Sequence, residues 1–190
     1  MLQAANTSKT LPQNRVPEVT VDFWLIKLMA VTMGETAADY LAVNLGLGLT
    51  ATSIIMSGIL VVALVLQFSQ KKYVPWAYWL TVVLISIVGT LITDNLVDNF
   101  EVPLATTTIA FSAALLATFI VWYASERTLS IHAVFTTRRE AFYWLAILFT
   151  FALGTAAGDL VAEHFDLGYL TTGVIFAAVI AAIAFAHFAL

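Results

Sequence analysis

Six apolar stretches dominate the chain, and each is about as long as a helix that crosses a bilayer. A span of roughly 20 apolar residues covers the ~30 Å hydrocarbon layer, where the helix must bond its own backbone groups. Charged residues make up 11% of the chain and hydrophobic residues 61%, so a soluble fold would lack polar surface. The sequence predicts an all-α, polytopic membrane bundle of six transmembrane helices. We place these at 23–43, 50–69, 74–97, 103–123, 141–163 and 170–190.

Composition also excludes several kinds of chemistry. The chain has no cysteine, which rules out disulfides, thiolate metal sites and cysteine nucleophiles. Its net charge of −4 is the opposite of a nucleic-acid-binding footprint, so we expect no nucleic-acid partner. No Ser-His-Asp spacing, Walker loop, dinucleotide fingerprint or HExxH motif is present. We therefore expect neither an enzyme nor an organic cofactor.

The basic residues predict the orientation in the membrane. Except for Lys27, they lie in the polar tail of residues 1–21 and in the two connections after the second and fourth spans. The remaining connections hold no lysine or arginine and instead carry acids, among them Asp98 and Glu163. Positive charge favours the cytoplasmic side, so both termini are expected there. The residues that decide this are Lys9, Arg15, Lys71, Lys72, Arg127, Arg138 and Arg139.

The odd-numbered spans share a pattern at fixed spacing. A tryptophan is followed ten residues later by glycine, five residues after that by aspartate, and thirteen residues later by threonine. Three such matches indicate internal duplication into parallel two-helix repeats, at about 22–70, 74–125 and 139–190 of a membrane domain spanning 22–190. The members are Trp24, Trp79 and Trp144; Gly34, Gly89 and Gly154; Asp39, Asp94 and Asp159; and Thr52, Thr107 and Thr172.

Acidic residues within the odd spans are the candidate site. Parallel repeats place the three aspartates toward the same, non-cytoplasmic face, and an acid inside a membrane span predicts function. Carboxylates with hydroxyl and amide neighbours suit a hard divalent cation or protons. The glycines would serve close helix packing. The candidate metal ligands are Glu35, Asp39, Asp94 and Asp159, supported by Thr36, Thr90, Asn95, Thr155 and Lys27.

Two alternatives remain open for these residues. Each aspartate lies near the end of its span, where a charge costs less, so all three could be hydrated ends of packed helices. Lys27 lies roughly 12 Å below Glu35 on the same helix, too far to pair with it directly. The lysine would either snorkel to the interface or meet an acid on another span. We expect the threonines that close each pattern to satisfy hydrogen bonds of the helices.

The chain resembles a family of bacterial membrane proteins built from tandem two-span repeats of unknown function. The resemblance rests on the segment VPEVTVDFWLIK at 16–27 and on the strings GETAAD, GTLITD and GTAAGD. The resemblance covers roughly residues 15–190 and implies an inner-membrane helical bundle. Members usually carry a fourth repeat, which nothing after Leu190 supplies. The resemblance thus leaves open a fragment, a three-repeat variant or completion by a homo-oligomer.

The leading expectation is a transporter-like membrane protein that binds a manganese- or magnesium-type cation, or protons, at these carboxylates. A second hypothesis is a scaffold or binding protein in which the glycines and aspartates only shape helix packing. A third, a carrier of a cationic small molecule, is weaker because the tryptophans lie at the opposite interface. Membrane lipid and a small cation or proton are the expected partners.

Overall fold

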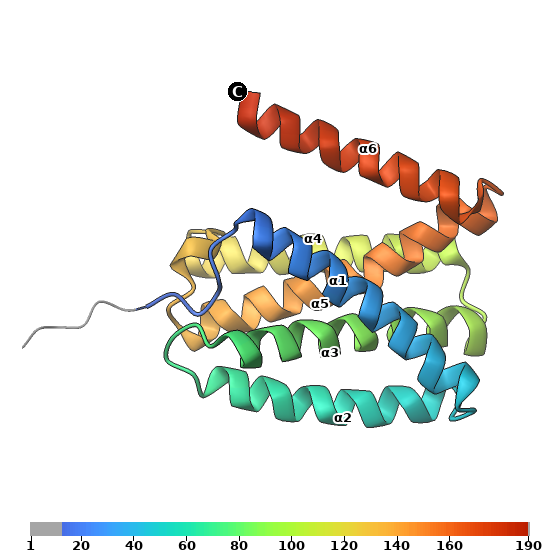
Figure 1. The fold of residues 1–190 in the computed structure, drawn as a ribbon, viewed down its shortest axis with the longest axis horizontal. Helices are drawn as coiled ribbons and strands as arrows, with labels where there is room; N and C mark the ends of the chain where they lie inside the picture. Colours follow the sequence, from blue (N-terminus) through green and yellow to red (C-terminus); the bar gives the residue numbers. More distant parts are fainter. Residues whose placement is uncertain (1–12, 190) are drawn as a thin grey trace, which may run out of the picture.

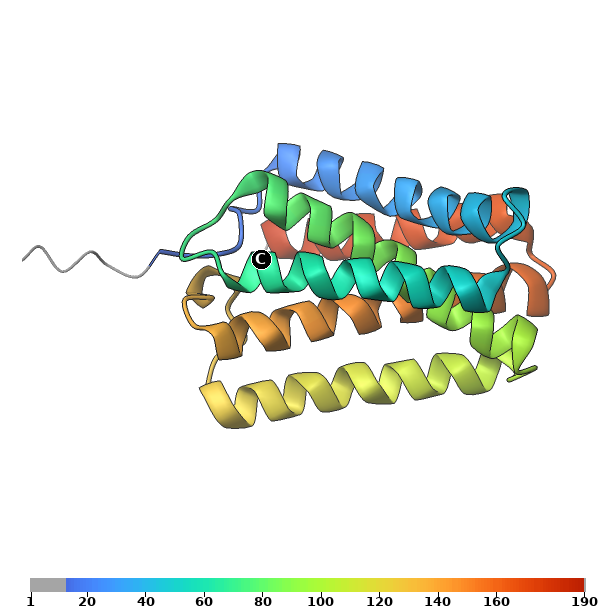
Figure 2. The same ribbon diagram turned by 90° about the horizontal axis from the view of Figure 1, so that it is seen from below.

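The computed structural model describes residues 13–189 and is helical throughout, with connecting turns (Figure 1). The odd-numbered long helices run in one direction and the even-numbered ones return, as Figures 1 and 2 show. We call the two ends of the bundle the tryptophan end and the aspartate end, after the motif residues near them. The long helices are α1 (Val21–Asp39), α2 (Leu49–Phe68), α3 (Pro75–Asp94), α4 (Leu104–Glu126), α5 (Thr137–Asp159) and α6 (Gly168–Ala189).

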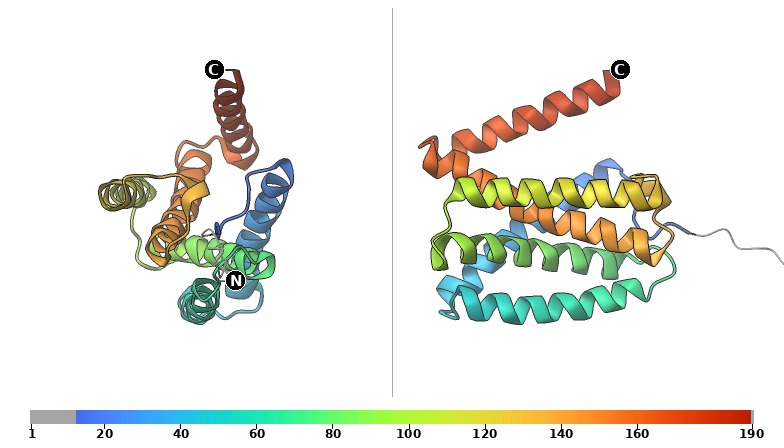
Figure 3. Two further views of the ribbon diagram at one scale, coloured as in Figure 1. Left: turned by 90° about the vertical axis from the view of Figure 1, so that its left-hand side faces the viewer. Right: turned by 180° about the vertical axis from the view of Figure 1, so that it is seen from behind.

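Helix α3 forms the centre of the bundle. It packs against α1, α2 and α5, and 61% of its apolar segment is buried, compared with 22% for α2 and 17% for α4. Helix α4 packs against α5 on the other side. Helix α6 contacts mainly the turn before it and leans away from the bundle toward its C-terminal end (Figures 1 and 3).

The all-α fold is confirmed, and four of the six expected spans are long and apolar enough to cross a membrane. Helix α1 is not among them, since it carries four charged residues, and α6 contributes a shorter apolar segment, Gly168–Ile183. The four are Leu49–Phe68, Pro75–Asn99, Leu104–Glu126 and Thr137–His164.

Local signals define where the odd helices begin. The Thr20 hydroxyl accepts a hydrogen bond from the Phe23 N–H at the start of α1, and Thr136 accepts one from the Arg139 N–H at the start of α5. Helix α3 instead begins with Pro75, whose fixed φ suits the first turn. The odd helices begin three, four and seven residues before their motif tryptophans, so their starts are not in register, whereas all three end at the motif aspartate.

A five-residue π-helical turn follows each motif aspartate. In each turn, a backbone N–H bonds to the carbonyl five residues earlier, at 2.9–3.3 Å. Such turns are uncommon and often occur at functional sites. The residue seven positions after the aspartate then has positive φ in all three repeats, so the repeats share backbone conformation as well as sequence. The turns are Tyr40–Asn44, Asn95–Asn99 and Leu160–His164.

Two of the motif glycines let the odd helices approach closely. A Cβ atom added at Gly34 would lie 3.2 Å from the backbone nitrogen of Ile87 on α3. One added at Gly89 would lie 2.8 Å from Cβ of Phe151 on α5. The expected packing role therefore holds for these two glycines. It does not hold for Gly154, because no atom of the described chain lies within 4 Å of its added Cβ.

Part of the expected polar tail is packed against the bundle. At the tryptophan end, Asn14 donates to the Ile131 carbonyl and accepts from the Tyr73 N–H, both at 3.0 Å. The Arg15 N–H donates to the Val134 carbonyl at 3.1 Å. This segment joins the α2–α3 and α4–α5 connections. Residues 1–12 of the tail lie outside the described residues.

We predict that Gly89→Ala destabilises the fold by about 1–3 kcal/mol, because the added methyl overpacks the α3–α5 contact. The measurement is chemical or thermal unfolding in detergent. Gly58→Ala on α2 is the matched control, since an added Cβ there meets no atom within 4 Å. That control should be neutral or stabilising by about 1 kcal/mol through helix propensity. Equal stability losses in the two variants would contradict the packing role.

Candidate functional site: a carboxylate pocket

The motif aspartates end three parallel helices at the same end of the bundle, and they line one hollow of about 470 Å³. We call it the carboxylate pocket. Its walls come from all three repeats, as parallel repeats require. The acidic residues that line it are Glu35, Asp39, Asp94, Asp98, Asp159 and Glu163.

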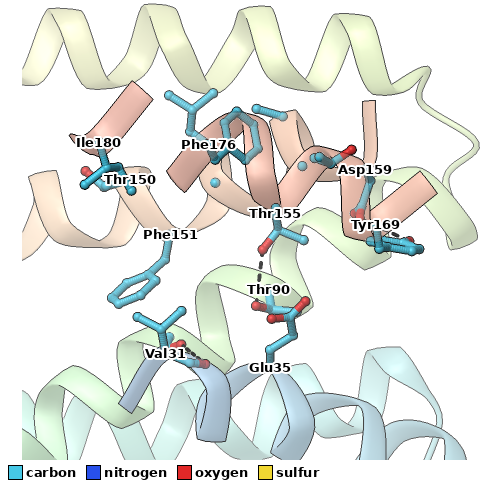
Figure 4. Close-up of a pocket in the computed structure, with 17 residues that line it drawn as sticks. Val31, Glu35, Thr90, Thr150, Phe151, Thr155, Asp159, Tyr169, Phe176 and Ile180 are labelled. Atoms are coloured by element: carbon cyan, nitrogen blue, oxygen red, sulfur yellow. Dashed lines mark hydrogen bonds between the residues drawn. The ribbon is translucent and has the colours of Figure 1, made fainter. Parts of the chain in front are cut away.

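A second hollow of about 660 Å³ continues from this pocket toward the middle of the bundle, between α1 and the α5–α6 pair (Figure 4). Val31 and Glu35 of α1 face Phe151 of α5 and Phe176 of α6 across it. We call it the α1–α6 wedge. The wedge and the pocket share Glu35, Thr90, Thr155, Asp159 and Tyr169.

Hydroxyl groups of α3 and α5 lie between the two hollows. Thr90 and Thr155 occupy equivalent positions one residue after their motif glycines and are hydrogen-bonded to each other at 3.3 Å (Figure 4). Thr93, also in the pocket wall, donates to the Ala152 carbonyl at 2.9 Å. These bonds join the two helices where the pocket adjoins the wedge.

Most of the expected site residues lie in the pocket wall, but three supporting residues, Thr36, Asn95 and Lys27, do not. Thr36 is exposed on α1 and lines neither hollow. Asn95 also lies outside both, because its amide is used elsewhere. Its Nδ2 donates to Ser53 Oγ at 2.6 Å, and its Oδ1 accepts from Asn99 at 2.8 Å. Asn95 therefore ties the end of α3 to the start of α2.

Sequence reasoning assigned Asp98 and Glu163 to the outer connections and did not place them in the site. Each lies four residues after a motif aspartate, and the π-helical turn keeps it on the pocket side. The same four-residue spacing was the signal available in the sequence. Tyr169 was also missed. Its hydroxyl donates to Glu163 and, at 3.4 Å, to Asp159.

The carboxylates surround the pocket without forming a compact ligand set. Within residues 13–189, no three acidic or histidine side chains lie close enough together to hold one metal ion. The arrangement thus offers negative charge around an open volume rather than a preformed coordination shell. Such a volume suits a cation that keeps part of its water, as magnesium does, or protons shared among carboxylates.

Lys27 neither snorkels nor meets an acid. Its Nζ is buried and lies 4.9 Å from the centre of the Phe151 ring, with no hydrogen-bond partner among the described residues. A desolvated cation–π contact contributes about 2 kcal/mol, whereas desolvating an ion costs several kcal/mol. The ammonium is therefore a net cost to stability, a feature typical of a functional residue.

A buried ion pair at the tryptophan end was also missed. Glu140 is fully buried and contacts Arg15 at 2.6 Å, and its other oxygen accepts from Gln67 at 2.8 Å. The Trp144 indole lies 3.4 Å from that oxygen. Close by, the hydroxyls of the buried tyrosines that precede the second and third tryptophans are 2.5 Å apart. This network closes the end of the bundle opposite the carboxylate pocket.

The pattern-closing threonines serve the helices, as expected. Each is buried, and each hydroxyl donates to the carbonyl four residues earlier, at 2.8–3.3 Å. None of these bonds reaches another helix. The residues are Thr52, Thr107 and Thr172.

Comparison with known proteins gives one family. The sequence profile described as Repeat of Unknown Function (DUF347) matches three times in tandem, at residues 23–73, 77–128 and 142–190. The expected membership of a tandem-repeat family of unknown function is thus confirmed. No curated protein and no solved structure matches the chain.

We predict that Glu140→Ala lowers the free energy of unfolding by about 3–5 kcal/mol, because it leaves the Arg15 guanidinium without its buried counter-charge. Unfolding in detergent measures the loss. Glu126→Ala is the matched control at the same end, since Glu126 pairs with arginines that are 22% and 66% exposed. The control should lose about 1 kcal/mol or less. A Glu140 variant as stable as the control would refute the network's role.

We predict that Lys27→Met raises thermal stability by about 1 kcal/mol or more, because it replaces an unpaired buried ammonium with an apolar side chain of similar length. Lys71→Met, at an exposed lysine, should change stability little. Differential scanning calorimetry in the same detergent compares the two. A clear loss of stability in Lys27→Met would mean that the Phe151 contact outweighs desolvation.

Proposed function

The chain belongs to the family of the Repeat of Unknown Function (DUF347), a description that assigns no activity. From the carboxylate pocket, we propose that the protein is a membrane transporter-like protein. The cargo is a hard divalent cation of the manganese or magnesium type, or protons. The observation that carries the proposal is the convergence of six carboxylates from three repeats on one hollow. Charge gathered this way attracts cations.

In this proposal all six helices cross a bacterial inner membrane, with both termini in the cytoplasm. The basic connections support the orientation, since Lys71 and Lys72 lie at the tryptophan end together with Arg138 and Arg139. The carboxylate pocket then faces the non-cytoplasmic side. The charged residues of α1 are tolerated because Glu35 and Asp39 face a polar hollow rather than lipid.

The ligand chemistry favours a hydrated ion. Carboxylate and hydroxyl oxygens suit magnesium or manganese better than copper or zinc. A magnesium-type ion commonly binds through one or two carboxylates and retains several waters. A hollow of about 470 Å³ leaves room for those waters. The continuation of the pocket into the α1–α6 wedge supports a path inward, past Thr90 and Thr155.

The alternative is a scaffold protein in which the motif serves helix packing alone. The observation in its favour is that the described carboxylates form no compact metal site. In that case the aspartates are hydrated helix ends, and the motif serves only the close packing of helices at the glycines of α1 and α3. Cation binding separates the two functions directly.

We predict that Asp94→Asn and Asp159→Asn each weaken Mn²⁺ binding at least tenfold, or about 1.4 kcal/mol, and slow Mn²⁺ uptake into proteoliposomes. Each variant removes one negative charge from the pocket and keeps the side-chain shape. Calorimetry or manganese electron spin resonance measures the affinity.

Asp166→Asn is the matched control, since Asp166 lies at the same end but outside the pocket, and asparagine tolerates its positive φ. Binding should be unchanged in this variant. If both pocket variants stay folded and still bind and transport manganese and protons normally, the transporter proposal fails and the scaffold function stands.

A further inference from the structure

The three motif glycines occupy equivalent positions but have different surroundings. Gly34 contacts Ser86 of α3, and Gly89 contacts Phe151 of α5. Ser86 and Phe151 are themselves equivalent, since each lies seven residues after the tryptophan of its repeat. The helices therefore pack head to tail, with each motif glycine against the seventh position of the next odd helix.

In this series of contacts, one motif glycine and one seventh position have no partner within the described chain. A Cβ atom added at Gly154 of α5 would meet no atom of another helix within 4 Å in the described chain. The unused seventh position is Val31 of α1, since the two glycine contacts of the described chain use Ser86 and Phe151. Both residues line the same α1–α6 wedge of about 660 Å³ (Figure 4). The two halves of one repeated contact thus lie open on a single chain.

The even helices also leave one packing position unfilled. Helix α2 packs against α3 and α4 against α5, but within the described residues α6 packs against no later odd helix. Its described side chains are exposed except for Thr172. The splayed position of α6 in Figures 1 and 3 agrees with this.

Helix α1 has the matching open face. Met29 and Met33 are 66% and 61% exposed. The equivalent α3 residues, Leu84 and Val88, are 6% and 4% exposed in the bundle that α2 and α5 help to form. The apolar face that is buried in α3 is therefore exposed at the equivalent positions of α1.

We propose that a second copy of this chain covers the exposed faces of α1 and α6. The α1 helix of the second copy packs in the wedge, against α5 and α6 of the first copy. Its Val31 lies against Gly154, as Phe151 lies against Gly89 within the chain. Close approach at a small residue is the usual basis of helix association in membranes. The contact is heterologous, so it closes into a ring or continues into a larger assembly. It also adds a wall to the hollow that reaches Glu35 and Asp159.

The absence of cysteine makes this contact directly testable. Val31→Cys and Gly154→Cys are placed in separate copies with different tags, co-expressed in the membrane and oxidised. We expect a mixed disulfide that joins the two tags. Val31→Cys with Ile59→Cys is the control pair, since Ile59 is exposed on α2, outside the proposed contact. No mixed dimer, or equal amounts from both pairs, overturns the proposal.

The double variant in one chain tests closure within a copy. A disulfide that forms only inside single chains would show that the chain's own α1 swings onto α5, which also overturns the proposal. Gly154→Leu provides an independent readout, because the described chain leaves space there. It should fold normally, as Gly58→Leu should, but sediment as a monomer in detergent.

Wild-type protein and Gly58→Leu should both sediment as a dimer or larger. A wild-type monomer of 20.7 kDa would overturn the proposal, with lipid as the occupant if native mass spectrometry finds it bound. These outcomes do not depend on manganese binding, so failure of the transport proposal and failure of this one are distinguishable.

Discussion

Close contact between parallel odd helices is the constraint on which the rest of the structure depends. At Gly34 and Gly89 the missing side chain lets α3 meet α1 and α5 at backbone distance. Because the contact recurs at one position of the repeat, the aspartate five residues further on always ends its helix near the same point. Three local sequence motifs thereby become the wall of one pocket. Phe151 connects this packing to the site, since it covers Gly89 and also lies beneath Lys27.

The two ends of the bundle handle charge in opposite ways. At the tryptophan end, Glu140 is matched by Arg15 and Gln67 and is sealed from solvent. At the aspartate end, six carboxylates line an open hollow whose described lining includes no lysine or arginine. Matched buried charge holds an end together, whereas unmatched negative charge favours a bound cation or proton. The unpaired Lys27 lies on α1 between these ends. Its stability cost fits a chain that keeps charge in the bundle for function.

The π-helical turns explain why the pocket is larger and more acidic than the motif alone predicts. Each turn carries the chain one residue further before the connection begins, and the fourth residue after the aspartate stays on the pocket side. In the second and third repeats that residue is Asp98 or Glu163, and in the first it is Val43. The four-residue spacing indicates a shared helix face, but 3.6-residue periodicity does not reveal that each helix continues through a π-helical turn after the aspartate. From sequence alone these acids were therefore placed in the connections.

The sequence by itself determined the helical class, the three parallel repeats and the common side of the motif aspartates, because hydropathy and fixed spacing are local properties that survive any packing arrangement. Tertiary structure decided the rest. It directed Asn95 to α2 instead of the pocket, buried Glu140 against Arg15 across 125 positions, and left Gly154 open where Gly34 and Gly89 are covered. Each of these depends on which helix lies beside which. Equivalent motif positions cannot reveal that, because the third repeat has its glycine and aspartate at the same spacing as the others, yet no other helix of the described chain packs against Gly154.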